Sequence, residues 1–532
     1  MQQLTLLFVV FLATIVAVPV SARLGLPSPV LMTVFGAVLA LIPDIPNPNL
    51  EPDLILPLVL PPLLFAAARR THWRRFKAGW RAVVGLAILL VLVSTAAVAA
   101  AFRELAPDVP LASAVLLGAL VSPPDPVAAT AVAGDVGLPR RLVNTLETEG
   151  LFNDVTAIVL YGVALSAAVS GHFSAPNALG KLLLSAVIAV VVGLGVGWLS
   201  ARLMGLLDDA TLQVALSLLV PFAAYVAADR LHGSGVLAVL LCGFYLSDTA
   251  SADDVAYRLV GTAFWDIVEL LVTGFAFGLI GEELHTVVDE VGNRWTGLLG
   301  HAMEIVGVVV FVRLLWLLPS GWFANRTRRG AGDDEDEDAP GPITWRESVI
   351  IWWGGMRGVV TVALALAIPL TVDGGAAFPG REQILFTAFV VVLFTLVVQG
   401  LTLPLLVRVL RVTADDKARR DAERHLWFRA AKAELRYLNE IADAEDVPDE
   451  LYERLARRQQ TRLAAACPEN VDDELRELAE KRVSELRQFR QLEQRMIAAG
   501  REEMLAARAE PGTDPELVDR VIRRLDLRTD RR

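Results

Sequence analysis

Residues 111–134 read LASAVLLGALVSPPDPVAATAVAG, an apolar run that contains prolines and an acid. It is apolar enough to lie in a membrane, yet Asp125 stands near its middle between Pro123, Pro124 and Pro126. Prolines lack a backbone N–H and clash with the preceding turn, so a helix must break at this point. A broken helix at membrane depth is tolerated only where it is buried in protein or lines a cavity. The stretch therefore predicts an interrupted transmembrane helix with a carboxylate at the interruption.

The interruption has two interpretations. Free carbonyls at the break, the Asp125 carboxylate and the hydroxyls of Ser122 and Thr130 supply oxygen atoms of the kind that hard cations prefer. In the structural alternative, the prolines only kink the helix and Asp125 pairs with a neighbouring side chain. This stretch by itself leaves both interpretations open.

The rest of the chain places this helix in a polytopic membrane protein. Of the 532 residues, 54% are hydrophobic, and long uncharged runs recur from Leu4 to Leu410. Roughly 20 apolar residues cross a bilayer core as a helix, and helices satisfy the backbone groups that lipid leaves unpaired. We expect an all-α fold with about 13 transmembrane helices, with 12 or 14 as alternatives. The runs are 4–21, 28–43, 53–68, 82–102, 110–133, 143–168, 181–204, 211–228, 234–248, 261–281, 299–319, 347–371 and 383–410.

Basic residues in the short loops predict the orientation, because Lys and Arg accumulate on the cytoplasmic side. With an external N-terminus, fifteen of them fall in cytoplasmic loops and five in external loops. We expect a multi-pass protein of the bacterial inner membrane with its N-terminus outside and its C-terminal tail in the cytoplasm. The first run has a second interpretation as a signal peptide, since VPVSA (18–22) offers a small-residue cleavage pattern, although no basic residue precedes it.

Two domains are expected, a transmembrane domain over residues 1–410 and a helical cytoplasmic tail over residues 411–532. The tail is rich in Ala, Glu, Arg and Leu, with acid–base pairs at helical spacing, and either regulates the membrane domain or supports folding and assembly. Cys242 and Cys467 fall in different domains, which argues against a disulfide framework or a metal site. The net charge of −11 argues against nucleic acid as a partner, and we expect no cofactor.

A second intramembrane acid lies in residues 144–165, NTLETEGLFNDVTAIVLYGVAL. Asp154 stands about 12 residues, or roughly 18 Å, from the cytoplasmic end of its helix, which places it near the midplane. Asn153 is its neighbour, and Glu149 lies one turn below Asn153. Charged residues at this depth are costly and are functional candidates by default. A carboxylate in such a place can hold either a proton or a cation but not both, and that competition is the mechanism of an antiporter.

Residues 348–369, SVIIWWGGMRGVVTVALALAIP, predict a second interrupted helix. Gly354, Gly355 and Gly358 loosen it near mid-membrane, and Arg357 places a permanent cation there. A buried guanidinium needs a carboxylate partner, and we expect that partner to be Glu149. The pair is expected to hold two helices together rather than to carry ions, with a gating role as the alternative.

The two interrupted helices occupy matching places in the chain. If residues 4–168 and 211–410 are two six-helix halves, each interrupted helix is the fifth of its half, which is the pattern of inverted repeats around a midplane site. A further polar stripe, Asp266, Glu269 and Thr273, is interpreted either as a packing seam with Arg313 or Arg230 or as part of the ion path.

These residues resemble the sodium/proton exchanger family of the monovalent cation:proton antiporter superfamily. The resemblance covers residues 1 to about 410. It is carried by LPPLLFAAA (60–68), SPPDPVAATAV (122–132), EGLFNDVTAIVLY (149–161), GSGVLAVLLCG (233–243), FWDIVELLVTGFAFGLIGEEL (264–284) and WGGMRGVVTVALALAIP (353–369).

The resemblance implies a homodimer with a dimerisation domain and a six-helix core domain that moves like an elevator. It implies that Asp154 binds the cation and the proton, that Asn153 marks the electroneutral branch, and that Glu149 and Arg357 form a buried pair. It also matches Asp125 to the family's acid in the first broken helix. This chain departs from the family at Pro124, Thr273 and residues 66–68, where other members often have Thr, Asn and an acid, so cation choice does not transfer with the resemblance.

The sequence thus favours a secondary antiporter that exchanges Na⁺, with Li⁺ or K⁺ as alternatives, for H⁺ in cation and pH homeostasis. Potassium/proton exchange is the main rival. A rival from another class is an intramembrane aspartyl protease using Asp125 and Asp154, although an asparagine and a proline-broken cage suit ion coordination better. A third is a cation-gated sensor that signals through the tail.

Overall fold

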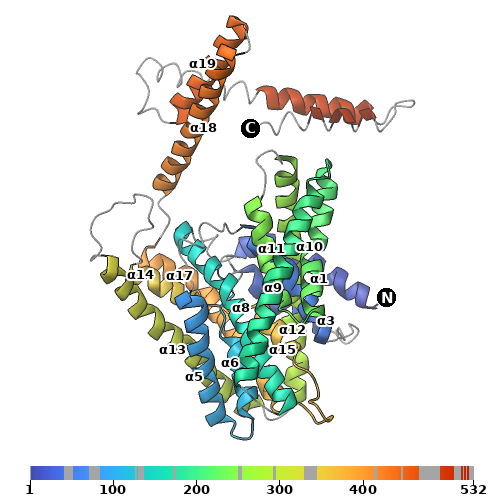
Figure 1. Ribbon diagram of the computed structural model, residues 1–532, viewed down its shortest axis with the longest axis vertical. Helices are drawn as coiled ribbons and strands as arrows, with labels where there is room; N and C mark the ends of the chain where they lie inside the picture. Colours follow the sequence, from blue (N-terminus) through green and yellow to red (C-terminus); the bar gives the residue numbers. More distant parts are fainter. Residues whose placement is uncertain are drawn as a thin grey trace. The chain divides into compact units, whose positions relative to one another are not determined.

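Figure 1 shows the fold of the protein as a computed structural model. The structure describes residues 2–24, 26–40, 52–70, 84–125, 137–171, 175–249, 255–291, 295–328, 344–412, 416–444, 447–466 and 492–507, with a few isolated residues elsewhere. Two of the predicted site residues, Pro126 and Thr130, lie outside the described residues. The chain divides into two compact units, Met1–Ala414 and Asp415–Arg532, and their predicted roles as transport domain and regulatory tail stay predictions.

The first unit is built from helices, and described helices lie on every apolar run of the sequence. In the N-terminal half these are α1 (Gln2–Leu24), α2 (Ser28–Ala40), α3 (Pro52–Arg70), the π-helical η1 (Val84–Leu89), α5 (Leu90–Leu105), α6 (Leu111–Val121), α8 (Arg140–Ser170) and α9 (Ala175–Met204). In the C-terminal half they are α10 (Ala210–Arg230), α11 (Gly235–Thr249), α12 (Val255–Val291), α13 (Trp295–Arg328), α14 (Trp345–Trp353), α15 (Val359–Leu366), α16 (Arg381–Phe394), the π-helical η3 (Thr395–Gln399) and α17 (Gly400–Leu410).

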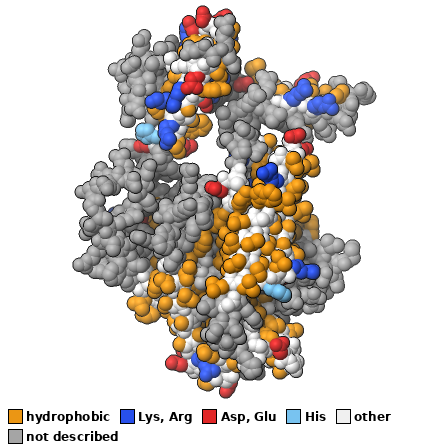
Figure 2. Space-filling view, viewed as in Figure 1, with side chains coloured by type: hydrophobic (Ala, Val, Ile, Leu, Met, Phe, Trp, Pro, Cys, Tyr) orange, Lys and Arg blue, Asp and Glu red, His pale blue; other side chains and the backbone are white. Residues whose placement is uncertain are grey.

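Length and composition support a membrane-spanning role for these helices. Seven of the described helices are long and apolar enough to cross a membrane, and four shorter apolar helices accompany them, α6 among them. Hydrophobic side chains cover much of the flank of this unit on the face drawn in Figure 2. The predicted all-α membrane fold is confirmed, and the number of crossings stays a prediction.

The two predicted interruptions are both present. Helix α6 ends at Val121, and the chain from Ser122 to Asp125 is no longer helical, because Pro123 and Pro124 supply no backbone N–H to continue it. The second interruption separates α14 from α15, where residues 354–358 run in a non-helical conformation. A capping box starts α14, in which the Thr344 and Glu347 side chains satisfy each other's backbone N–H groups.

The membrane helices pack in two groups. One group comprises α5, α6, α8, α13, α14, α15 and α16, in which α6 packs against α5, α8, α15 and α16. The other comprises α1, α2, α3, α10, α11 and α12, with α9 packed on α10 and α11. The groups meet where α3 contacts α8 and α15 and where α12 contacts α15 and α16. Both interruptions and the α8 carboxylates therefore belong to the first group, at its boundary with the second.

The described residues of the second unit are largely helical, as its composition predicted. Helices α18 (Asp416–Ala444) and α19 (Asp449–Ala466) pack together with Ala431 and Ala456 buried. Polar contacts between the two helices are exposed, such as Arg462 to Glu434 at 3.4 Å. Residues 492–507 form a further helix.

Candidate functional site

The two interruptions contact each other directly. The Asp125 N–H donates to the Met356 carbonyl at 2.6 Å, and the Val359 N–H donates to the Asp125 Oδ2 at 3.0 Å. Because Val359 is the first residue of α15, the Asp125 carboxylate lies at a helix N-terminus, where unpaired N–H groups and the helix dipole favour a negative charge. At Gly358 any Cβ atom would overlap the Asp125 carboxylate, so only glycine permits this contact.

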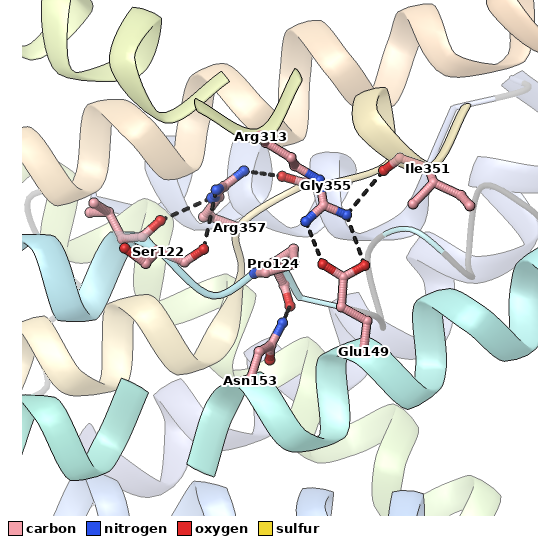
Figure 3. A network of polar contacts seen from close by, with 9 residues as sticks. Ser122, Pro124, Glu149, Asn153, Arg313, Ile351, Gly355 and Arg357 are labelled. Atoms are coloured by element: carbon pink, nitrogen blue, oxygen red, sulfur yellow. Dashed lines mark hydrogen bonds and ion pairs between the residues drawn. The ribbon is translucent and has the colours of Figure 1, made fainter. Parts of the chain in front are cut away.

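Arg357 makes the reciprocal contact. Its side chain is buried, and its guanidinium donates to the carbonyls of Val121 at 3.0 Å and Ser122 at 3.2 Å, as well as to the Gly355 carbonyl (Figure 3). The first two carbonyls lie at the C-terminal end of α6, where a cation is favourable. Each broken helix therefore supplies a charged side chain to backbone groups of the other helix that have no hydrogen-bond partner within their own helix.

Glu149 has a different partner from the predicted one. Its carboxylate forms a bidentate ion pair with Arg313 of α13, in which Arg313 Nη2 lies 2.9 Å from Glu149 Oε2 and Nη1 contacts Oε1 (Figure 3). Arg313 also donates to the Ile351 carbonyl at 3.0 Å, at the end of α14. The prediction that Glu149 pairs directly with Arg357 is therefore wrong. The Arg357 guanidinium donates to backbone carbonyls instead.

Arg313 is the residue of this site whose role the sequence did not reveal. It was expected, if anywhere, beside the polar stripe of residues 266–273, whereas it is 2% exposed and bound to Glu149. A signal was present, since a lone arginine in the middle of the apolar run 299–319 requires a buried carboxylate. The sequence does not determine whether Glu149 forms its ion pair with Arg313 or with Arg357.

Helix α8 brings its amide and its second carboxylate to the same place. The Asn153 Nδ2 donates to the Pro124 carbonyl at 3.2 Å, so α8 binds the freed backbone of the first interruption (Figure 3). Its Oδ1 is buried, and no donor reaches it among the described residues. Asp154, on the next position, is 5% exposed and near enough to Asp125 for the two carboxylates to repel each other. Within the described part of the chain, no hydrogen-bond donor or basic side chain contacts the Asp154 carboxylate.

The predicted site residues therefore converge to a large extent. Asp125, Pro124 and Asn153 are linked by the contacts above, and Asp154 lies beside them, while Gly355 and Gly358 lie against Arg313 and Asp125. Ser122 does not direct its hydroxyl to a free site, since it donates to the Gly118 carbonyl at 2.5 Å and contacts the Thr95 hydroxyl at 3.2 Å.

An apolar contact separates this site from the second helix group. Phe152 of α8 stacks on Phe244 of α11 with ring centroids 5.9 Å apart. Val155, one position beyond Asp154, packs against Leu240 and Ala68 of the same cluster. The buried carboxylates thus lie behind a hydrophobic boundary between the two groups.

The structure is that of a membrane transport protein built around two interrupted helices that meet at their breaks, with carboxylate and carbonyl oxygens at this crossing. The family described as "sodium/hydrogen exchanger, transmembrane" matches residues 8–409, so the chain belongs to the sodium/hydrogen exchanger family. The members of this family are ion antiporters, so the protein is a transporter and not an enzyme, which removes the intramembrane protease alternative.

Relatives of known name and a solved structure agree with this assignment. An uncharacterized Na⁺/H⁺ exchanger of Mycobacterium tuberculosis is 32% identical over 89% of this chain and 87% of its own length. A sodium, potassium, lithium and rubidium/H⁺ antiporter of Bacillus subtilis is 29% identical over 72% of this chain and 58% of its own length. The sodium proton antiporter MjNhaP1 of Methanocaldococcus jannaschii has a similar fold, with a TM-score of 0.59 and 21% identity over 77% of this chain and 99% of that one.

Proposed function

We propose that the protein is a secondary active antiporter that exchanges Na⁺ for H⁺ by competition of the two ions for Asp154. The observation that carries the proposal is the Asp154 carboxylate, buried at the crossing of the broken helices without a basic partner among the described residues. Glu149, by contrast, is neutralised by Arg313, and Asp125 is held by the α15 N-terminus. Asp154 is therefore the carboxylate that requires either a proton or a cation when it is buried.

The surrounding oxygens complete a cation site around Asp154. Asn153 Oδ1 is a buried acceptor without a donor among the described residues, and the amide of the same side chain is anchored on Pro124 O. Asp125 contributes a second carboxylate. The Thr130 hydroxyl remains a further predicted ligand. A monovalent cation bound here would take oxygen ligands both from the first interruption and from α8.

The buried charges favour one-for-one, electroneutral exchange. Among the described residues at the crossing, three carboxylates (Asp125, Glu149 and Asp154) accompany two guanidiniums (Arg313 and Arg357). One bound Na⁺ or one proton on Asp154 makes this set neutral, whereas the empty site keeps one negative charge. An uncompensated charge is costly inside a membrane, so the loaded forms cross and the empty form does not. That difference couples the two fluxes.

Alternating access requires the helix group that carries the site to move against the other. The boundary between them is largely apolar, with Phe152, Val155 and Ile158 of α8 facing residues of α3 and α11. Apolar contacts of this kind can slide past one another without breaking strong polar contacts.

We also propose a homodimer in the bacterial inner membrane, with the N-terminus outside and the tail in the cytoplasm.

Cation selectivity has one specific alternative to sodium. The Bacillus subtilis relative is named for sodium, potassium, lithium and rubidium, so K⁺/H⁺ exchange by the same carboxylate is the second candidate function. A site made of carboxylate, carboxamide and loose carbonyl oxygens does not by itself exclude the larger ion.

The test is proton flux in proteoliposomes that carry a pH dye inside an acidified lumen. Sodium, lithium or potassium is added in turn to vesicles with the native protein, the Asp154→Asn variant, or an Asp373→Asn control, whose site is exposed in the segment between α15 and α16. The proposal expects cation-evoked alkalinisation in the native protein and the control, and none in Asp154→Asn. The most effective salt identifies the substrate. Flux that survives in Asp154→Asn would contradict the assignment of the ion-binding carboxylate.

A further inference from the structure

The second interruption leaves backbone N–H groups without helical partners. Beyond α14, the N–H groups of Gly354 and Gly355 still reach carbonyls of that helix, at 2.8 and 3.3 Å. The Arg357 N–H does not, and it lies in the middle of the membrane unit, where no water replaces a lost partner. Its acceptor is the Oγ1 of Thr395, at 3.0 Å, from a different helix.

Thr395 is placed for this contact by a π-helical turn. It is fully buried and begins η3, a wide turn inserted between α16 and α17. Such turns are rare and occur frequently at functional sites. Its hydroxyl donates to the Val392 carbonyl three residues earlier at 3.1 Å. Other threonines of the protein bond the carbonyl four residues earlier, as in an ordinary helix: Thr14, Thr33, Thr148 and Thr156.

The two hydrogen bonds define what Thr395 does. A hydroxyl has one proton to donate and lone pairs to accept. Because the proton is committed to Val392, the oxygen lone pair is available to the Arg357 N–H. The interrupted segment is thus held from two sides, by Thr395 at its backbone and by the α6 carbonyls at the Arg357 side chain.

The same segment holds Asp125. Met356, immediately before Arg357, accepts from the Asp125 N–H, and Val359, two residues after it, donates to the Asp125 carboxylate. A displacement of the Arg357 backbone therefore moves two groups that hold Asp125, the Met356 carbonyl and the Val359 N–H. On the basis of the proposed function, we propose that Thr395 is a positioning residue of the ion site, which orients Asp125 by accepting the Arg357 backbone N–H.

Two substitutions at Thr395, one that removes the acceptor and one that keeps it, test this role. Thr395→Val keeps the shape of the side chain and removes the acceptor, whereas Thr395→Ser keeps the acceptor and removes a methyl group. The control is Thr387→Val, which places valine at a buried threonine two turns earlier on α16. All are assayed in proteoliposomes by proton flux against sodium concentration, with the rate expressed per amount of incorporated protein.

Thr395→Val is expected to raise the apparent KM for sodium about tenfold, with the maximal rate within about twofold of native, because one hydrogen bond to a buried group is lost. Thr395→Ser and Thr387→Val should stay within about threefold of the native KM. A purely packing role predicts the opposite order, with serine worse than valine. A native KM in Thr395→Val, or equal impairment in Thr395→Ser, would overturn the proposal.

A second measurement separates this inference from the proposed function. If Thr395→Val yields too little protein for the flux assay, the melting temperatures of Thr395→Val and Thr395→Ser in detergent test the hydrogen bond instead. The acceptor role requires Thr395→Ser to melt above Thr395→Val, and the reverse order overturns it. If the native protein shows no cation-dependent proton flux, the proposed function fails, while the order of melting temperatures still tests the hydrogen bond.

Discussion

Replacing Glu149 is expected to destabilise the protein more than replacing its partner Arg313. The two side chains form a bidentate pair and are 1% and 2% exposed, so each loss leaves a charge buried without its counter-ion. Arg357 breaks the symmetry between them, because its charge is close enough to be repelled by Arg313 and attracted by Glu149. The Glu149→Gln variant leaves two buried cations facing each other. The Arg313→Gln variant leaves Glu149 with Arg357 as a neighbouring cation.

The magnitude follows from the burial of the pair. Removing one partner of a buried ion pair typically costs about 3–5 kcal/mol. Arg313→Gln should lie at or below the lower end of this range, because Arg357 compensates part of the loss. Glu149→Gln should lie at the upper end. In the double variant neither charge of the pair remains, so it should be more stable than Glu149→Gln alone.

The assay is thermal denaturation of the purified protein in detergent, followed by loss of the monodisperse peak in size-exclusion chromatography. A matched control is the exposed pair Arg457 and Glu453 on α19, whose atoms lie 2.6 Å apart. Exposed pairs contribute about 0–1 kcal/mol, so Glu453→Gln should leave the melting temperature nearly unchanged. A melting temperature of Glu149→Gln equal to or above that of Arg313→Gln would refute the charge argument. So would a double variant less stable than Glu149→Gln.

Three further predictions concern the site and its boundary. Gly358→Ala should abolish sodium-dependent proton flux, because its Cβ would overlap the Asp125 carboxylate; Gly162→Ala on α8, where a Cβ meets nothing within 4 Å, should keep it. Near-native flux in Gly358→Ala would show that the contact is not required. In a Phe152→Cys variant without the native cysteines, adding Phe244→Ala should let a hydrophilic thiol reagent reach position 152, since the Phe244 ring no longer covers it. Equal labelling with Phe244 present would rule out a covering role. Finally, if proton and cation compete for one carboxylate, the apparent KM for sodium should rise up to about tenfold per unit fall in pH on the acidic side, at constant maximal rate. A KM independent of pH would exclude competition.

Much of the site was predictable because its prolines, glycines and charged residues are unusual inside apolar membrane helices. Three prolines and an acid in an apolar run predicted the first interruption, and three glycines with an arginine predicted the second. The depth of Asp154 follows from counting residues along one helix, which requires no tertiary information. Asp125, Asn153 and Asp154 were predicted as parts of one ion site from their depth in the membrane and from the family resemblance, and the contacts of the described residues agree with their proximity.

The partners of the charged groups were less predictable. Arg313 and Arg357 both lie in apolar runs, and both are suitable partners for Glu149 by charge and depth. Sequence position specifies depth along a helix axis but not which helix faces which, so it does not choose between them. The hydroxyl of Ser122 was one of the oxygens that the sequence offered at the first interruption, yet the neighbouring turn and Thr95 of α5 occupy it.

An all-helical membrane transporter with two interrupted helices and carboxylates inside its apolar runs follows from the order of the amino acids alone. Those conclusions depend on the cost of polar groups in lipid, which acts on each residue wherever its neighbours lie. The packing of the helices, in contrast, selects the partners of the charged groups: Arg313 neutralises Glu149, Arg357 binds the end of α6, and Thr395 accepts from the Arg357 backbone N–H. Hydrogen bonds require an approach to about 3 Å in a defined direction, and that geometry arises only when the helices pack.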